Sequence, residues 1–186
     1  MTLFNRAIPV LESDTINIPQ PGEYISAQSS TNGATLTTVG AEFKGQYNPA
    51  KTGYSNRVAV GDVVYVDNAG TGRPDFITQV TNVNSDTVLT LDPPVAIAAP
   101  YDYSIYRSNG GLNNVTAGNP GYTLEGPFQT NTVLHVIPAG QDSPVFIKPD
   151  AAGNFSTEKI LVQRVLDTGT INIAKFGFVA LQKSDD

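Results

Sequence analysis

The chain has 186 residues and a formal net charge of −6, with 11 Lys and Arg against 17 Asp and Glu. Nucleic-acid binding and docking to an anionic membrane both need a positive field, so this charge argues against both functions. The absence of cysteine excludes disulfides, thiol catalysis and Cys-ligated metal sites. Val, Ile and Thr account for 49 residues, and these β-branched side chains fit a sheet better than a helix. We therefore expect an all-β protein made of small antiparallel barrel or sandwich modules.

Residues 1–34 are expected to form an extended N-terminal arm followed by a loop. Three prolines punctuate the start of this segment, and Thr15–Ile18 alternates polar and apolar side chains as an edge strand does. Residues 26–34 are small and polar, which is typical of a loop. Such an arm is suited to lie across neighbouring subunits, so we expect a partner subunit to order it.

Residues 35–107 contain the clearest strand pattern and are expected to form one β module. Short alternating segments are separated by residues that favour turns. The expected strands are, in chain order, 35–39, 57–60, 63–66, 76–83, 87–91 and 101–106. Asp92-Pro93-Pro94 is expected to stop the fifth of them. The tip at 67–75 is interpreted as a turn rather than a calcium loop, because Arg73 brings a positive charge into it.

The rest of the chain is expected to divide into a linker and a second β module. Residues 108–132 are rich in Asn and Gly, which predicts a linker or a long loop. Residues 133–186 are expected to form the C-terminal module, with a turn at 151–154 and strands at 133–137, 143–147 and 176–181. The segment 157–166 fits a helix or a strand, and its β-branched content favours the strand.

The sequence favours neither catalysis nor a bound cofactor, so we expect no enzyme and no metal site. His135 is the single histidine, and no second His or Cys can complete a transition-metal site. No Gly-x-Ser-x-Gly turn is present to pair a nucleophile with it. The segment Gly45–Thr52 lacks the second glycine of a phosphate-binding loop.

Aromatic and apolar side chains are instead candidates for contacts between subunits. The tyrosines are interpreted as rim and subunit contacts rather than a sugar-binding platform, since the chain has no tryptophan. The histidine is interpreted as a strand residue that faces a core or an interface. The candidate interface residues are Ile16, Ile18, Tyr24, Tyr101, Tyr103, Tyr106 and His135.

The segment from Val60 to Tyr106 resembles a module found in virion proteins of tailed bacteriophages. In this chain the module begins Val60-Gly61-Asp62-Val63-Val64 and continues, after a variable tip, with Val80-Thr81-Asn82-Val83-Asn84-Ser85-Asp86-Thr87-Val88-Leu89-Thr90-Leu91. It ends with the aromatic strand Tyr103-Ser104-Ile105-Tyr106. The resemblance covers about a quarter of the chain. It implies a structural role in a head or tail, and it carries no catalytic residues to transfer.

The resemblance and the composition together predict a virion structural protein that binds and stabilises the capsid exterior, as decoration or cement proteins do. Expected partners are the major capsid protein or other virion proteins and further copies of the chain, with a trimer as the first hypothesis. The acidic charge suits an exterior position better than contact with packaged DNA. We expect synthesis in the host cytoplasm without a signal peptide, residence in the virion, and neither nucleic acid nor membrane as a partner.

Two other functions stay open from the sequence. One is a neck or tail component, such as an adaptor, terminator or tube subunit, which should expose strand edges that pair between subunits. The other is a carbohydrate-binding β-module of a receptor-binding fibre, which should show an aromatic platform.

Overall fold

The computed structural model describes residues 4–20, 23–48, 53–55, 57–68, 74–108, 121–126, 131–148, 161–171 and 179–183. Strands, and no helices, form the regular structure of these residues, which confirms the all-β prediction. Accordingly, none of them belongs to a helix that could span a membrane. The chain divides into two compact units, unit 1 with Met1–Gly22 and Ser108–Asp186 and unit 2 with Glu23–Arg107.

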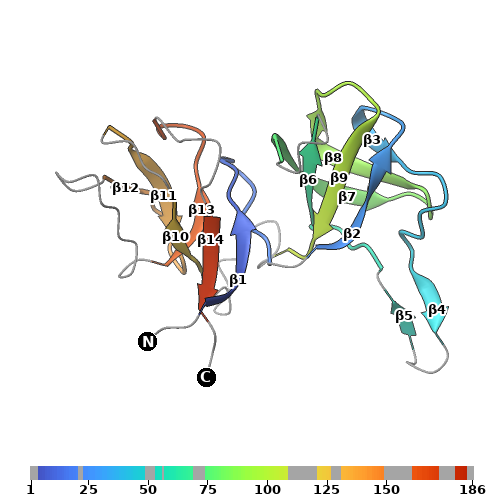
Figure 1. Ribbon diagram of the computed structural model, residues 1–186, viewed down its shortest axis with the longest axis horizontal. Coiled ribbons are helices and arrows are strands. Elements are labelled where there is room, and N and C mark those ends of the chain that lie inside the picture. Colours follow the sequence, from blue (N-terminus) through green and yellow to red (C-terminus); the bar gives the residue numbers. More distant parts are fainter. Residues whose placement is uncertain are drawn as a thin grey trace. The chain divides into compact units, whose positions relative to one another are not determined.

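Unit 2 is built on a six-stranded antiparallel sheet that curls into half of a barrel (Figure 1). In spatial order its strands are β2 (Glu23–Ser29), β9 (Tyr101–Tyr106), β6 (Val63–Asp67), β7 (Phe76–Val83), β8 (Val88–Val95) and β3 (Gly33–Thr37). The core inside the curl is aliphatic and aromatic, with Leu36, Val64, Leu89, Tyr101 and Ile105 fully buried. A separate two-stranded sheet pairs β4 (Gln46–Asn48) with β5 (Gly53–Ser55).

The segment 26–34, predicted as a loop, contributes residues 26–29 to strand β2. Residues 25–29 pair in an unbroken register with β9. Ile25 and Ala27 pack against the core while Ser26 and Gln28 are exposed. Ser26 and Gln28 therefore lie on the outer face of an edge strand. The loop prediction was wrong for residues 26–29 and also for Gly33 and Ala34, which belong to β3.

Residues 57–60, predicted as a strand, belong to no strand, and the chain turns at Val60 and Gly61. The Asp62 N–H donates to the Ala59 carbonyl, and the Asp62 carboxylate accepts the Ala59 N–H at 2.8 Å. The N–H groups of Ala59 and Asp62 are thus bonded within the turn, and the strand β6 begins only at Val63.

The strand β8 continues past Asp92, where the two prolines were predicted to end it. Pro93 and Pro94 lie in an irregularity of the β3–β8 ladder, between the pairs Thr35↔Thr90 and Gly33↔Val95. Proline is tolerated at such a bulge because the ladder does not need its missing N–H there.

Unit 1 contains two three-stranded antiparallel sheets. The first has the order β1 (Phe4–Pro9), β14 (Val179–Lys183), β10 (Thr123–Glu125), and the second has the order β12 (Val145–Ile147), β11 (Leu134–Pro138), β13 (Val162–Val165). The strand β13 confirms the strand interpretation of 157–166 for its residues 162–165.

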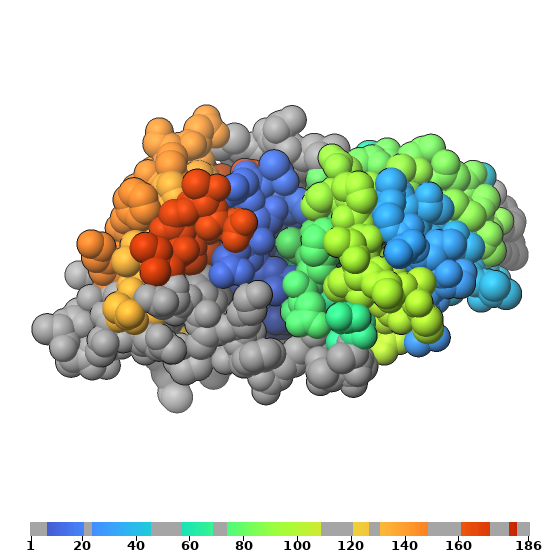
Figure 2. All heavy atoms as spheres, turned by 90° about the horizontal axis from the view of Figure 1, so that it is seen from above, coloured from blue at the N-terminus to red at the C-terminus, as the bar shows by residue number. Residues whose placement is uncertain are grey.

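The N-terminal residues, expected as an arm ordered by a partner, are part of unit 1 in the described structure. The strand β1 pairs with β14 from the other end of the chain, and Figure 2 shows blue atoms of the N-terminal segment beside the orange-red atoms of residues 161–171. Further along, the amides of Ser13 and Ile18 donate to the Val165 and Gln163 carbonyls next to them. Apolar burial of Ile16 and Ile18, 3% and 2% exposed, helps to offset the entropy lost on ordering this segment.

The segment 108–132, expected as a linker, contains the strand β10. Tyr122 and Leu124 are fully buried, and β10 pairs with β14. The remaining predictions for 109–120, 127–130, 151–154 and the central part of the tip at 67–75 lie outside the described residues, as does the start of the strand predicted at 176–181.

Unit 2 is an insertion into unit 1. On the unit 1 side, the Gln20 side-chain amide donates to the Ser108 carbonyl at 3.1 Å. On the unit 2 side, Glu23 pairs with Tyr106. The chain therefore leaves unit 1 and returns to it at neighbouring points, which is the usual geometry of a tolerated domain insertion.

Candidate functional site

A buried carboxylate holds the Gly61-Asp62 turn, where the resemblance to phage virion proteins begins. Asp62 is 2% exposed, and its Oδ2 accepts hydrogen bonds from the Tyr24 hydroxyl at 2.5 Å and the Ala59 N–H at 2.8 Å. The Arg107 guanidinium donates to the same oxygen at 2.8 Å in an ion pair. Gly61 has a φ of +96°, which favours glycine at this turn.

The other members of this cluster reinforce a structural role. The Arg107 guanidinium lies 3.9 Å from the centroid of the Tyr24 ring. Burial, followed by the bond to Asp62, raises the pKa of the Tyr24 hydroxyl far above its usual value. Tyr24 therefore stays protonated as a donor, and the cluster ties together the start of β2, the turn before β6 and the residue after β9.

The other predicted tyrosines lie in or against the core of unit 2. Tyr101 and Tyr103 are 1% and 2% exposed, and burial raises the pKa of both hydroxyls. Tyr106 is half-buried and its ring is tilted by 52° against Tyr65, with 5.0 Å between centroids. Tyr101 and Tyr103 are therefore buried within unit 2, as Ile16 and Ile18 are within unit 1. None of these four predicted interface residues is exposed to a partner.

His135 is half-buried and forms an aromatic pair with the exposed Phe146 on the sheet β12-β11-β13 of unit 1. His135 and Phe146 are cross-strand partners, and their rings stack with 4.1 Å between centroids and 9° between planes. Phe146 is 63% exposed. Val133 projects from the same face of this sheet as His135 and pairs with Ile171, which is 51% exposed. We call Val133, His135, Phe146 and Ile171 the unit 1 patch.

The loop after β13 fixes the orientation of the histidine in this patch. His135 Nδ1 lies 2.7 Å from the Thr168 carbonyl oxygen, which can only accept, so Nδ1 carries the proton. The backbone of Gly169 lies against the imidazole so closely that a Cβ would be 2.9 Å from Nδ1. The His135 N–H donates to the Thr170 hydroxyl at 3.0 Å.

The side-chain carboxylate of Asp14, in the N-terminal segment, in turn holds this loop. Asp14 accepts the Thr168 hydroxyl at 2.6 Å and the Thr168 N–H at 3.0 Å. The side-chain bond and then the backbone bond from Thr168 lower the pKa of the Asp14 carboxyl. The N-terminal segment thus helps to position the loop on which His135 rests.

The sequence indicated only one member of the unit 1 patch. Phe146 stands between Val145 and Ile147, and a run of three apolar residues does not reveal which side chain faces outward. The pairing of Phe146 with His135 shows which face it lies on, and these two residues are eleven positions apart in the sequence. The sequence likewise did not indicate Ile171 as a surface residue of this sheet, because that assignment depends on its pairing with Val133.

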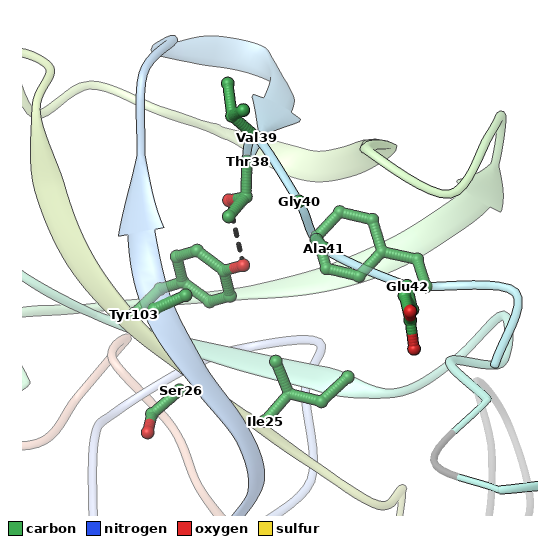
Figure 3. A pocket seen from close by; sticks show the side chains of 10 residues that line it. Ile25, Ser26, Thr38, Val39, Gly40, Ala41, Glu42 and Tyr103 are labelled. Carbon is green, nitrogen blue, oxygen red and sulfur yellow. Dashed lines mark hydrogen bonds between the residues drawn. The ribbon is translucent and has the colours of Figure 1, made fainter. Parts of the chain in front are cut away.

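A second feature missed from the sequence is a cavity of about 330 Å³ in unit 2 (Figure 3). It opens between strand β2, at Ile25–Ala27, and the segment Thr38–Phe43. The Tyr103 side chain reaches the cavity from β9, and its hydroxyl lies 2.9 Å from the Thr38 hydroxyl.

Neither feature has the composition of a metal site. Within the described ranges, no group of three or more His, Asp or Glu side chains gathers as metal coordination would require. Comparison of the chain with known protein families, with curated proteins and with solved structures gave no match.

Proposed function

We propose that this chain is a non-enzymatic virion structural protein that binds and stabilises the exterior of a capsid. The observation that carries this proposal is the unit 1 patch, a partly exposed surface in which Phe146 and Ile171 are the exposed apolar side chains. Contiguous exposed apolar side chains on a protein mark contact surfaces, and aromatic side chains contribute most to such contacts. A sheet presents them in fixed positions, which reduces the entropy lost on binding.

The resemblance of residues 60–106 to phage virion proteins supports the same class of function. Asp62, the acidic residue of that motif, is occupied in holding the turn and has an arginine as its ion-pair partner. A role for the motif in architecture fits this arrangement. The net charge of −6 is compatible with an outer surface that does not touch packaged DNA.

Stabilisation would follow from mass action. A protein that binds only the assembled shell shifts the equilibrium towards that shell. If several copies or several neighbouring sites are engaged together, weak contacts at each patch add to a strong attachment.

The test compares particles that lack this protein with the same particles after purified protein is added back. Wild-type protein should delay DNA release on heating. Phe146→Ser should weaken binding at least tenfold, because it removes the most exposed ring of the patch. Val60→Ser is the matched control, since Val60 is 56% exposed but belongs to unit 2. If particles without the protein retain DNA equally well, the capsid proposal is wrong.

A neck or tail component is the second candidate, and the edge of β2 that faces away from β9 favours it. This strand has seven residues, and within the part of the chain that the structure describes it pairs with no strand but β9. Ring-forming subunits can pair such edges with one another. Location of the protein in the tail of the particle, together with a six- or twelve-fold ring in solution, would establish this candidate instead.

A further inference from the structure

The half-barrel of unit 2 has a seam between its edge strands β2 and β3, and the seam is closed at one end. There the Ser30 N–H donates to the Thr37 carbonyl at 2.8 Å, and the Thr37 N–H donates to the Ser29 hydroxyl at 3.3 Å. The last bond of this closed end joins the Thr38 hydroxyl to the Gln28 carbonyl at 3.0 Å. From Ala27 back to Ile25, strand β2 and the segment Thr38–Phe43 separate around the 330 Å³ cavity.

The open end of the seam presents backbone groups of β2. The Gln28 carbonyl faces the seam, because Thr38 reaches it from there. Backbone N–H and C=O groups of a strand alternate between its two sides, so those of Ser26 face the seam as well. Ser26 also lines the cavity and is exposed. Among the described strands β2 pairs only with β9, so an incoming chain can form ladder bonds at Ser26.

The cavity beside Ser26 has an apolar floor and a carboxylate. Its apolar lining comes from Ile25, Ala27, Val39, Ala41, Phe43 and Tyr103. Glu42 is exposed and is the only Asp, Glu, Lys, Arg or His among the described residues that line the cavity. Figure 3 shows Ile25 and Tyr103 on one side of the cavity and Ala41 and Glu42 on the other. Its size is at the lower end of ligand pockets, about 300–1,000 Å³, and suits one or two side chains.

We propose that this seam is a binding site for an extended, positively charged segment of another protein. The segment adds a strand to β2 at Ser26, inserts an apolar side chain into the cavity and places a Lys or Arg beside Glu42. Charge decides between this occupant and a second copy of the chain: each copy carries −6, and the site itself contributes a carboxylate. The seam is a different surface from the unit 1 patch, so either proposal can fail without the other.

The test selects peptides from a library of random decapeptides displayed on messenger RNA, using the whole protein as target. The expected peptides alternate in polarity and carry an apolar residue flanked by Lys or Arg. On titration with a synthetic selected peptide, NMR amide shifts should change at 25–28 and 38–43. Failure to enrich any peptide, enrichment of acidic peptides, or shifts confined to other residues would overturn the proposal.

Two substitutions of Ser26 separate the backbone bond from the side chain. Ser26→Pro removes the N–H that faces the seam and should weaken peptide binding at least tenfold. Ser26→Ala keeps that N–H and should leave the affinity within twofold. Glu42→Gln should weaken binding about two- to fivefold, as expected for an exposed ion pair. Equal affinity of wild type and a folded Ser26→Pro protein would contradict strand addition.

A change in the peptide keeps the test valid even if Ser26→Pro fails to fold. Methylation of the peptide's backbone nitrogens, one at a time, removes one donor without altering the protein. Strand addition predicts that binding falls at alternate positions only, because every second N–H points towards β2. Equal effects at all positions, or none, would exclude pairing with the strand edge.

Discussion

Asp62 has a larger structural role than an acidic residue in a short turn usually has. Its Oδ2 accepts hydrogen bonds from the Tyr24 hydroxyl, the Ala59 N–H and the Arg107 guanidinium. A single charged group therefore connects three separate parts of unit 2. If the Asp62 charge is removed, the desolvation cost of the Arg107 charge and of the other buried donors is no longer offset by strong hydrogen bonds.

Asp62→Asn should therefore lower the free energy of unfolding by about 2–3 kcal/mol, below the fully buried case because the Arg107 side chain is 39% exposed. Urea denaturation followed by circular dichroism measures the change. Asp92→Asn is the control in the same unit, since Asp92 is exposed, and it should stay within about 0.5 kcal/mol of wild type. Equal effects of the two substitutions would refute the assigned role.

Two glycines of unit 1 separate backbone strain from packing. Gly121 and Gly140 have φ values of +63° and +75°, so alanine is strained at both. A Cβ at Gly121 would lie 2.6 Å from the Ala139 Cβ and 2.8 Å from the Leu161 Cβ, whereas one at Gly140 would meet nothing within 4 Å. We expect Gly140→Ala to cost about 1–2 kcal/mol and Gly121→Ala about 1–3 kcal/mol more. Similar urea midpoints for the two variants would show that Ala139 and Leu161 can move away from the added Cβ at little cost in free energy.

The N-terminal segment and the loop after β13 are coupled through a titratable group. The two bonds from Thr168 lower the pKa of Asp14 in the folded protein. A carboxyl with a lowered folded pKa stabilises the fold at pH values above its unfolded pKa of about 3.9. That stabilisation is lost as the pH falls through the lower, folded pKa.

Asp14→Asn should accordingly be less stable than wild type at pH 7, and the difference should shrink as the solution is acidified below about pH 4. Thermal unfolding across this pH range measures it. Thr168→Val removes the hydroxyl donor, so the effect of Asp14→Asn should be smaller in that background. A difference that is constant with pH would mean that the carboxylate charge is not responsible.

The strands that the sequence predicted correctly are those whose pattern is local. In β7 and β9 the alternation, or the run of β-branched and aromatic residues, is visible without knowledge of any partner. The strands β2 and β10 were missed because small polar or glycine-rich neighbours hide residues that are buried only by a distant strand, β9 or β14. For the same reason His135 was a candidate from the sequence while Phe146, its stacking partner, was not.

The two units differ in whether one continuous segment of the chain or two separate segments form them. Unit 2 is continuous, Glu23–Arg107, and has its own core and sheet. Unit 1 is assembled from both ends: β1 completes the sheet with β14 and β10, and Ile16 and Ile18 are buried. A domain with its own core can fold alone, whereas a split domain needs both of its segments.

We therefore expect Glu23–Arg107 to fold when expressed alone, with dispersed amide signals in an NMR spectrum that match those of the full chain. Ser108–Asp186 alone should not fold, because it lacks β1 and the buried isoleucines at 16 and 18. A chain in which a short Gly/Ser linker replaces unit 2 should recover the fold of unit 1, because Gln20 and Ser108 are already in contact. If Ser108–Asp186 gives the unit 1 spectrum without the N-terminal segment, that segment does not belong to the unit. Asp14 would then have no part in holding the loop beneath His135.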